Sequence, residues 1–168
     1  MSAYELAQLN IGIIKGPMDS PLMADFANNL ARINALAECS PGFIWRLQTE
    51  QGDATAIRAF DDENLLVNMS VWRDVASLDQ YVYRSEHVEL MRRRREWFEK
   101  MDQAFFVLWW IPKGHIPSID EAIAKLALLR NQGSTEQAFT FRQRFPSPDE
   151  ALADPENSYA DRCPAWQP

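Results

Sequence analysis

Two predicted strands each carry one apolar face and one polar face. In residues 6–13 and 66–72 every second residue is apolar, and the residues between them include Gln8, Asn10, Asn68, Ser70 and Trp72. Side chains alternate across a strand with a period of two, so these groups share one face. We expect the apolar faces to pack under helices. The polar faces must then contact either water or a lined cavity, and a cavity would indicate a protein that handles small molecules.

The other elements complete a β-α-β-β-α-β order. Alternating, branched and aromatic stretches predict strands near residues 4–14, 43–49, 66–72 and 105–111. Capping residues, turn signals and apolar stripes predict helices near 20–39, 74–84, 86–101 and 118–131. This order is typical of the ferredoxin-like split βαβ fold, an α+β fold with helices on one face of the sheet.

The chain is long enough for one sizeable core but not for two. It has 168 residues, of which 46% are hydrophobic, and we assign residues 1–145 to one domain. Residues 146–168 hold five prolines, five acidic residues and one arginine among mostly polar neighbours. Such a segment buries too little apolar surface to order itself, so we predict an extended or disordered tail.

Charge and cysteine content narrow the class of protein. The net charge is -7, which argues against a nucleic-acid partner. Cys39 and Cys163 fall in the body and the tail respectively, and two such cysteines make no disulfide framework. The first residues lack the basic and apolar regions of a signal peptide, and the apolar run 104–112 is too short to cross a membrane. We therefore expect a cytoplasmic protein without a membrane segment.

The sheet face that carries Trp72 would be bare in a monomer with helices on the other face only. The second and fourth strands would add one alternating set each, either Phe43, Trp45 and Leu47 or Ile44, Arg46 and Gln48, with Trp109 or Trp110. A large apolar side chain on a bare face favours a covering partner. We therefore predict a homodimer in which two sheets enclose a lined barrel.

His87 is the strongest candidate for a general base. Ser85 can cap the helix that follows, which places His87 in the first helical turn, where the helix dipole disfavours a charged imidazolium. His87 shares a stripe with Met91, Arg94, Phe98 and Met101, which turns it towards the sheet. The alternative is a half-buried structural histidine, because no partner carboxylate is evident. His115 lies in a Gly-His loop and is interpreted as a loop residue.

The run of four arginines at residues 92–95 is interpreted mainly as a solvated helix face. Acidic residues at positions 89, 96 and 99 can pair with three of these arginines at i,i+4 spacing. Arg94 has no acidic residue four positions away on either side and shares the direction of His87. Arg94 is therefore the arginine that we assign to binding.

The aromatic residues suggest a flat ligand, and the absence of several motifs argues against other classes of site. Trp45, Trp72 and Trp110 are candidates to stack on a flat ligand, although core packing is the alternative for each. The sequence contains no Gly-rich phosphate loop, no paired Cys/His metal spacing and no Gly-x-Ser-x-Gly nucleophile motif. We expect no metal site and no cofactor.

Several of these residues also carry a family resemblance. The run Asn68 to Trp72, followed by Leu78, Tyr81, Ser85-Glu86-His87 and residues 92–97, resembles the third strand and second helix of the dimeric α/β barrel superfamily. Over about residues 5–145 the chain is similar to an uncharacterised bacterial family related to antibiotic-biosynthesis monooxygenases. The resemblance implies the fold. It leaves several activities open, because the superfamily includes cofactor-free oxygenases, haem-degrading enzymes, isomerases and proteins without assigned activity.

The haem-degrading branch of that superfamily fits poorly. Its pattern implies an Asn on the first strand, a Trp in the second helix and an axial His seven residues after a Ser that resembles Ser85. Asn10 matches the first position, but Val82 stands at the Trp position and Arg92 at the axial His position. The pattern therefore argues against haem degradation.

The leading hypothesis is a cofactor-independent monooxygenase or isomerase that acts on an enolisable or aromatic compound. His87 would remove a proton, while Asn10, Asn68 and Arg94 would hold the resulting enolate or a carboxylate. Ser70, Trp72, Trp45 and Trp110 would form the rest of the substrate site. The alternatives are a non-catalytic ligand-binding or structural homodimer and, third, a haem-binding protein.

Overall fold

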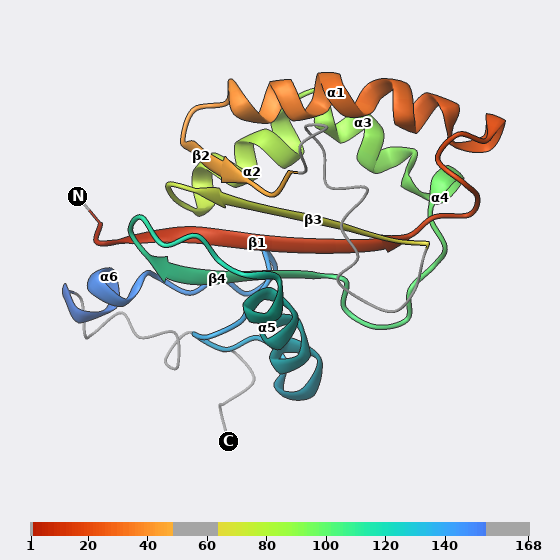
Figure 1. The fold of residues 1–168 in the computed structure, drawn as a ribbon. Coiled ribbons are helices and arrows are strands. Elements are labelled where there is room, and N and C mark those ends of the chain that lie inside the picture. The colour runs from red at the N-terminus through yellow and green to blue at the C-terminus, as the bar shows by residue number, and fades with distance from the viewer. Residues whose placement is uncertain (1, 49–63, 154–168) are drawn as a thin grey trace.

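The sheet has four antiparallel strands in the order β2-β3-β1-β4, as the computed structural model shows for residues 2–48 and 64–153 (Figure 1). The strands are β1 (Tyr4–Ile13), β2 (Phe43–Arg46), β3 (Leu65–Trp72) and β4 (Phe106–Pro112). β1 lies in the centre and pairs with both β3 and β4. The β1–β3 register places Gln8 opposite Ser70 and Asn10 opposite Asn68. The polar residues of the two strands are therefore direct cross-strand neighbours, as their shared face requires.

Helices cover both faces of this sheet (Figure 1). On one face lie a short 3-10 helix (Pro21–Met23), α1 (Ala24–Glu38), α2 (Val75–Arg84), α3 (His87–Arg92) and α4 (Arg94–Trp97). α5 (Ile119–Gln132) packs on the other face against β4 and β1. The α+β class and the ferredoxin-like order are confirmed, but the expectation of helices on one face only is wrong. The predicted helix at 118–131 is the one that covers the second face.

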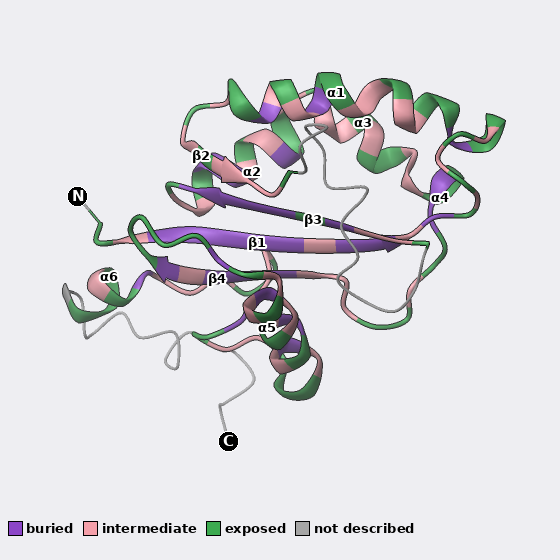
Figure 2. Ribbon diagram, viewed as in Figure 1, coloured by how far each residue is buried: buried purple, intermediate pink, exposed green. Residues whose placement is uncertain are grey.

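The apolar face of the sheet forms the main core under α5. Side chains from three strands and from α5 interlock there, namely Ala7, Leu9, Ile11, Val67, Met69, Val71, Val107, Trp109, Ile111, Ala122, Leu126 and Leu129. Figure 2 shows β1 and β3 mostly buried, while the outer surface of α1 is largely exposed. The apolar half of the strand pattern therefore lies under a helix, as expected.

The polar face of β1 and β3 points towards α1–α4 of the same chain. Trp72 is fully buried there, with Tyr81 stacked on it at 5.0 Å between ring centroids and Phe43 edge-on at 5.4 Å. Our expectation that Trp72 needs a second copy to cover it is therefore wrong, because the chain's own helix α2 covers this side chain. Homodimer formation stays a prediction.

Two helices, α2 and α5, begin where the sequence indicates, but the helix predicted for residues 86–101 ends early. Asp74 and Ser118 cap α2 and α5 by accepting hydrogen bonds from the backbone N–H groups of Ser77 and Glu121. The helix predicted for residues 86–101 is broken at Arg93 and ends at Trp97. Phe98 is already extended and forms a bridge with Ile14, which draws the chain back to the end of β1.

The segment after residue 145 begins with an ordered contact to the N-terminus. Residues Pro148–Ala153 form α6, and the Asp149 carboxylate accepts hydrogen bonds from the Ala3 N–H at 2.7 Å and the Ser2 hydroxyl at 3.0 Å. These six residues are helical rather than extended, and residues 154–168 lie outside the described part. The domain boundary at residue 145 stays a prediction. In the described ranges no helix is long and apolar enough to cross a membrane.

Candidate functional site

A pocket of about 780 Å³ lies between the polar face of the sheet and helices α1–α4. Its floor is formed by the polar residues of β1 and β3, and its walls are mostly apolar. The wall residues from α1 include Phe26, Leu30 and Ile33, which form the helix's apolar stripe.

Gln8 organises the floor of the pocket through its side-chain amide. Its Nε2 group donates to Asn68 Oδ1 at 3.1 Å and to Ser70 Oγ at 2.9 Å, and its Oε1 accepts from Asn10 Nδ2 at 3.4 Å. Ser70 Oγ also accepts from the Trp72 indole at 2.8 Å. Gln8 is only 4% exposed, and this network satisfies its amide. The outcome is a fixed row of polar groups on neighbouring strands.

Asn68 presents a hydrogen-bond donor to the pocket. Its Oδ1 is engaged by Gln8, whereas its Nδ2 group has no partner in the part of the chain that the structure describes. Asn68 is exposed to the pocket space, while Gln8 and Ser70 beneath it are buried. An amide N–H held in this way can stabilise negative charge on a ligand oxygen.

His87 lies on the wall opposite this floor. Its backbone N–H donates to Ser85 Oγ at 3.1 Å, as expected of a capping serine, although Glu86 and not Ser85 occupies the N-cap position of α3. The imidazole packs on Tyr81 at 4.8 Å between centroids, and its Nδ1 lies 3.4 Å from the Val82 carbonyl oxygen. A proton on Nδ1 would face that carbonyl and leave the Nε2 lone pair available as a base.

Burial keeps the His87 ring neutral. Desolvation lowers the pKa of His87 below its ordinary value of 6.5, and the hydrogen bond to the Val82 carbonyl opposes this only in part. A neutral imidazole at pH 7 can accept a proton, which is the condition that a general base must meet. Burial also raises the pKa of the neighbouring Tyr81 hydroxyl, so this phenol stays protonated.

Arg94 lies further along the same wall. Its guanidinium packs over the rings of Phe98 and Phe105, at 4.7 and 4.5 Å from their centroids, and Nη2 donates to the Ile11 carbonyl at 2.9 Å. Desolvation lowers the pKa of Arg94, although an arginine stays charged at neutral pH. A positive charge therefore lies at the pocket wall.

The pocket brings together six of the eight residues predicted for the site. His87, Asn10, Arg94, Asn68, Ser70 and Trp72 all line it, as do the predicted stripe residues Met91, Phe98 and Met101. Their roles stay predictions, but their placement on one cavity agrees with the sequence pattern.

Trp45 and Trp110 do not line the pocket. A register shift between Phe43 and Trp45 in β2 places Phe43 beside Trp72 and turns Trp45 to the apolar face, so neither alternating set that we expected on β2 is kept intact. Trp110 lies on the polar face, but Phe139 packs near it and its indole donates to the Phe145 carbonyl at 3.0 Å. The segment that follows α5 therefore covers Trp110.

Sequence reasoning did not assign two residues that shape the site. Gln8 was recognised as part of the polar face, but its role in orienting Asn10, Asn68 and Ser70 depends on the β1–β3 register. Tyr81 links Trp72 to His87 by ring contacts, and its place four residues before Ser85 was the available signal. No group of three or more metal-ligating side chains gathers within residues 2–48 and 64–153.

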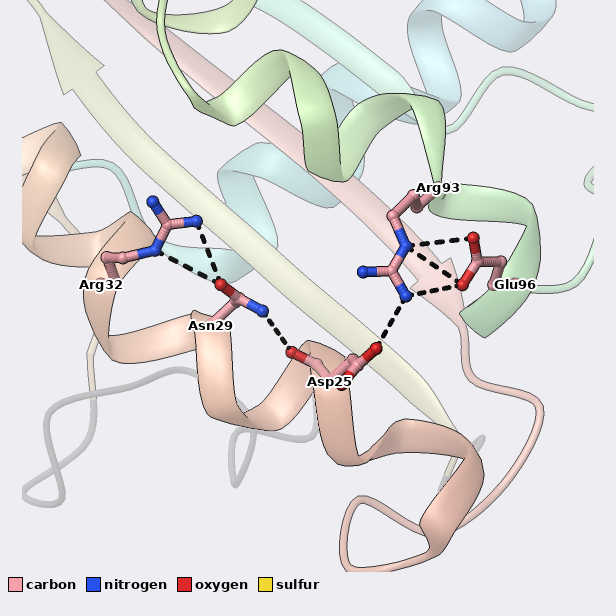
Figure 3. Close-up of polar contacts among 5 residues, drawn as sticks. All are labelled: Asp25, Asn29, Arg32, Arg93 and Glu96. Carbon is pink, nitrogen blue, oxygen red and sulfur yellow. Dashed lines mark hydrogen bonds and ion pairs between the residues drawn. The ribbon is translucent and has the colours of Figure 1, made fainter.

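Two of the four arginines form ion pairs on the surface within the described residues, at i,i+3 spacing rather than the expected i,i+4 spacing. Arg92 pairs with Glu89, and Arg93 pairs with Glu96. Arg93 also reaches across to Asp25 on α1 at 2.8 Å, which ties the junction of α3 and α4 to that helix (Figure 3). The break in the helix at Arg93 changes the spacing that a continuous helix would give.

Comparison with known protein families assigns the chain to one of them. A family described as "Domain of unknown function (DUF3291)" matches residues 5–155. The chain belongs to the DUF3291 family. The prediction that the chain belongs to an uncharacterised family is therefore confirmed. The relation of this family to monooxygenases stays a prediction. No protein of curated function matches it significantly.

Several solved structures are similar to this DUF3291 chain at low identity. SnoaB from Streptomyces nogalater, described as a cofactor-independent oxygenase, is 19% identical over 69% of this chain and 100% of that one, with a TM-score of 0.45. A protein of unknown function from Nitrosomonas europaea is 13% identical over 69% and 97% of the two chains, at a TM-score of 0.44. A Pseudomonas aeruginosa protein is 15% identical over 68% and 98%, also at 0.44.

Proposed function

We propose that the pocket is the active site of a cofactor-independent monooxygenase or isomerase that acts on an enolisable or aromatic compound. The observation that carries this proposal is the placement of a neutral, half-buried imidazole opposite a row of fixed amide groups. His87 supplies the base, and Asn68 and Asn10 supply donors for an oxyanion. The apolar walls exclude water from a flat ligand and strengthen these polar interactions.

The reaction follows from these two features. His87 Nε2 removes a proton from a carbon that is next to a carbonyl or conjugated with it through an aromatic ring, and the electron pair moves onto the carbonyl oxygen. The Asn68 Nδ2 group donates a hydrogen bond to this enolate oxygen and lowers its energy. In an isomerase the imidazolium returns the proton to another carbon of the enolate. In a monooxygenase dioxygen adds to the carbanion, and the proton passes to the terminal oxygen to give a hydroperoxide. Loss of water from this hydroperoxide breaks its O–O bond and leaves one oxygen atom on the carbon as a ketone.

Anthrone is a suitable probe because it is a flat, three-ring ketone with an acidic methylene group. We expect the protein to accelerate exchange of this methylene with deuterated water, measured by NMR, or the uptake of dioxygen, measured with an oxygen electrode. Replacing the base in His87→Ala should slow this reaction by about 10²–10⁴-fold. His115→Ala is the matched control, because His115 is exposed and outside the residues that line the pocket.

Two results would contradict the proposal. A His87→Ala protein with the wild-type rate would remove His87 as the base. A wild-type protein that binds anthrone but neither exchanges nor oxidises it would favour a non-catalytic ligand-binding protein.

Homodimer formation is proposed independently of the reaction, and sedimentation of a monomer at micromolar concentration would contradict it.

A further inference from the structure

Arg94 differs from Arg92 and Arg93 by having no acidic partner within the described residues. Arg95 shows no ion pair in this part of the chain either, but it is exposed and does not line the pocket. Arg92 pairs with Glu89 at 2.8 Å. Arg93 is held by Glu96 and Asp25, and Figure 3 shows both of these contacts. The hydrogen bond of Arg94 goes to a neutral backbone carbonyl. Arg94 also lies against the pocket rather than on the outer helix surface.

The surroundings of Arg94 hold its side chain in place without neutralising it. Phe98 and Phe105 stack on the guanidinium, and such contacts offset only part of the cost of removing a charge from water. Gly12 on β1 leaves room for this arrangement. A Cβ atom there would lie 2.5 Å from Phe98 Cδ1 and 3.2 Å from Arg94 Nη2.

The other charged residues that line the pocket do not offer the same site. Arg46 is paired with Glu38 at 2.7 Å, and Arg142 is exposed. Asp102 is exposed near Lys100 at the surface. Arg94 is therefore the cation of the described lining that is partly buried and lacks an acidic partner. One such charge is best matched by a ligand with one negative charge.

We propose that Arg94 binds a carboxylate of the ligand, so that the pocket takes flat aromatic acids. This inference rests on the proposed function and names its substrate class. The guanidinium has five N–H donors in a planar fork, and its bond to Ile11 uses one of them. The remaining donors can form the paired hydrogen bonds that arginine makes with a carboxylate.

The separation of Arg94 from His87 sets the size of the acid. Arg94 lies seven positions after His87, just beyond the break at Arg93, and a continuous helix would set their Cα atoms roughly 10 Å apart. Leu90 and Met91 lie between them on the pocket lining. A ligand that reaches both groups must place an apolar, flat body between its carboxylate and its acidic carbon. A fused-ring acid meets this condition, whereas a small keto acid does not.

The test compares two fluorescent probes of the same shape, anthracene-2-carboxylate and the neutral anthracene-2-carboxamide. We expect the wild-type protein to bind the carboxylate about ten- to a hundredfold more tightly in fluorescence titrations. Arg94→Met keeps the length of the side chain but removes the charge. In that variant the two probes should bind with equal affinity, because only the affinity for the carboxylate probe falls. Arg92→Met is the matched control and should keep the wild-type preference.

Each other outcome overturns the inference in a distinguishable way. Equal affinity of the wild-type protein for the two probes would overturn the carboxylate site and leave the role of His87 intact. If Arg94→Met lowers the affinity for both probes equally and also lowers the melting temperature, Arg94 is a structural residue. If neither probe binds to the wild-type protein, both the inference and the proposed pocket function are overturned. Loss of turnover with anthrone in His87→Ala remains an independent readout.

Discussion

The two faces of the sheet are built from the same strands but are covered in different ways. On the apolar face, α5 packs directly on Leu9, Val107 and Trp109 and leaves a dense core. On the polar face, α1–α4 stand off a row of hydrogen-bonded amides and leave a pocket of about 780 Å³. The difference shows how alternation along one strand can separate stability from binding. We therefore expect substitutions on the two faces to have different consequences.

The largest effect on stability should come from the apolar face. Trp109 is 1% exposed, and Trp109→Ala removes a large buried ring from the core. We expect the free energy of unfolding to fall by about 3–5 kcal/mol in urea denaturation. Trp109→Phe keeps an aromatic side chain and should cost less. A loss below about 1 kcal/mol for Trp109→Ala would mean that this face is not the main core.

A smaller effect is expected where the polar face approaches the helices most closely. Gly12→Ala places a methyl group against Phe98 and Arg94, as the short distances there indicate. We expect a loss of about 1–3 kcal/mol from overpacking, together with weaker binding of anthracene-2-carboxylate. Unchanged stability and binding would show that Phe98 and Arg94 do not pack against β1 in solution.

On the floor of the pocket we expect function to change more than stability. Asn68→Ala removes an exposed amide but leaves one Nε2 hydrogen of the buried Gln8 unpaired, so the free energy of unfolding should fall by about 1 kcal/mol. The rate of anthrone turnover should fall by about 10²-fold, because one donor to the oxyanion is lost. A stability loss of several kcal/mol with an unchanged rate would reverse the comparison between the two faces.

The smallest effect should be a dependence of stability on pH that originates from His87. Its pKa is lowered in the folded state, so the unfolded chain binds a proton more readily below pH 6.5. The free energy of unfolding should therefore fall as the pH drops through 6.5 towards the lower folded value. Urea denaturation of wild type and His87→Gln over this range isolates the contribution. An identical pH profile for both proteins would contradict a half-buried, neutral His87.

The sequence predicted which residues share the polar face, because a period of two is a local property of a strand. It also predicted that helices start near Asp74 and Ser118 and that the chain turns at Ser85, which depends on hydrogen bonds between near neighbours. These local signals were enough to predict the order of the strands and helices. They were also enough to place His87 and Arg94 on one side of the helical wall.

The sequence did not show what covers each face, because an apolar stripe on a helix does not specify which side of a sheet it contacts. The burial of Trp72 under α2 was missed for this reason, and a second copy was assigned to a place that the chain fills itself. Two local irregularities were also missed because no Gly or Pro marks them. One is the register shift in β2, which removes Trp45 from the pocket, and the other is the helix break at Arg93. Both depend on tertiary packing.

The central claim is that the ligand binds between the polar face and α1–α4. Two tryptophan indoles report on the two faces directly. The Trp72 indole lies on the polar face and donates to Ser70 Oγ at 2.8 Å, while the Trp109 indole lies on the apolar face and donates to Glu121 Oε1 at 2.9 Å. Both N–H groups are visible in NMR spectra of ¹⁵N-labelled protein, which can be titrated with anthracene-2-carboxylate.

We predict that the Trp72 indole signal shifts in proportion to ligand occupancy, while the Trp109 indole signal stays in place. His87→Ala should leave the Trp72 shift largely intact, because binding does not require the base. A titration in which the Trp109 signal moves and the Trp72 signal does not would place the ligand on the opposite face of the sheet and contradict the account.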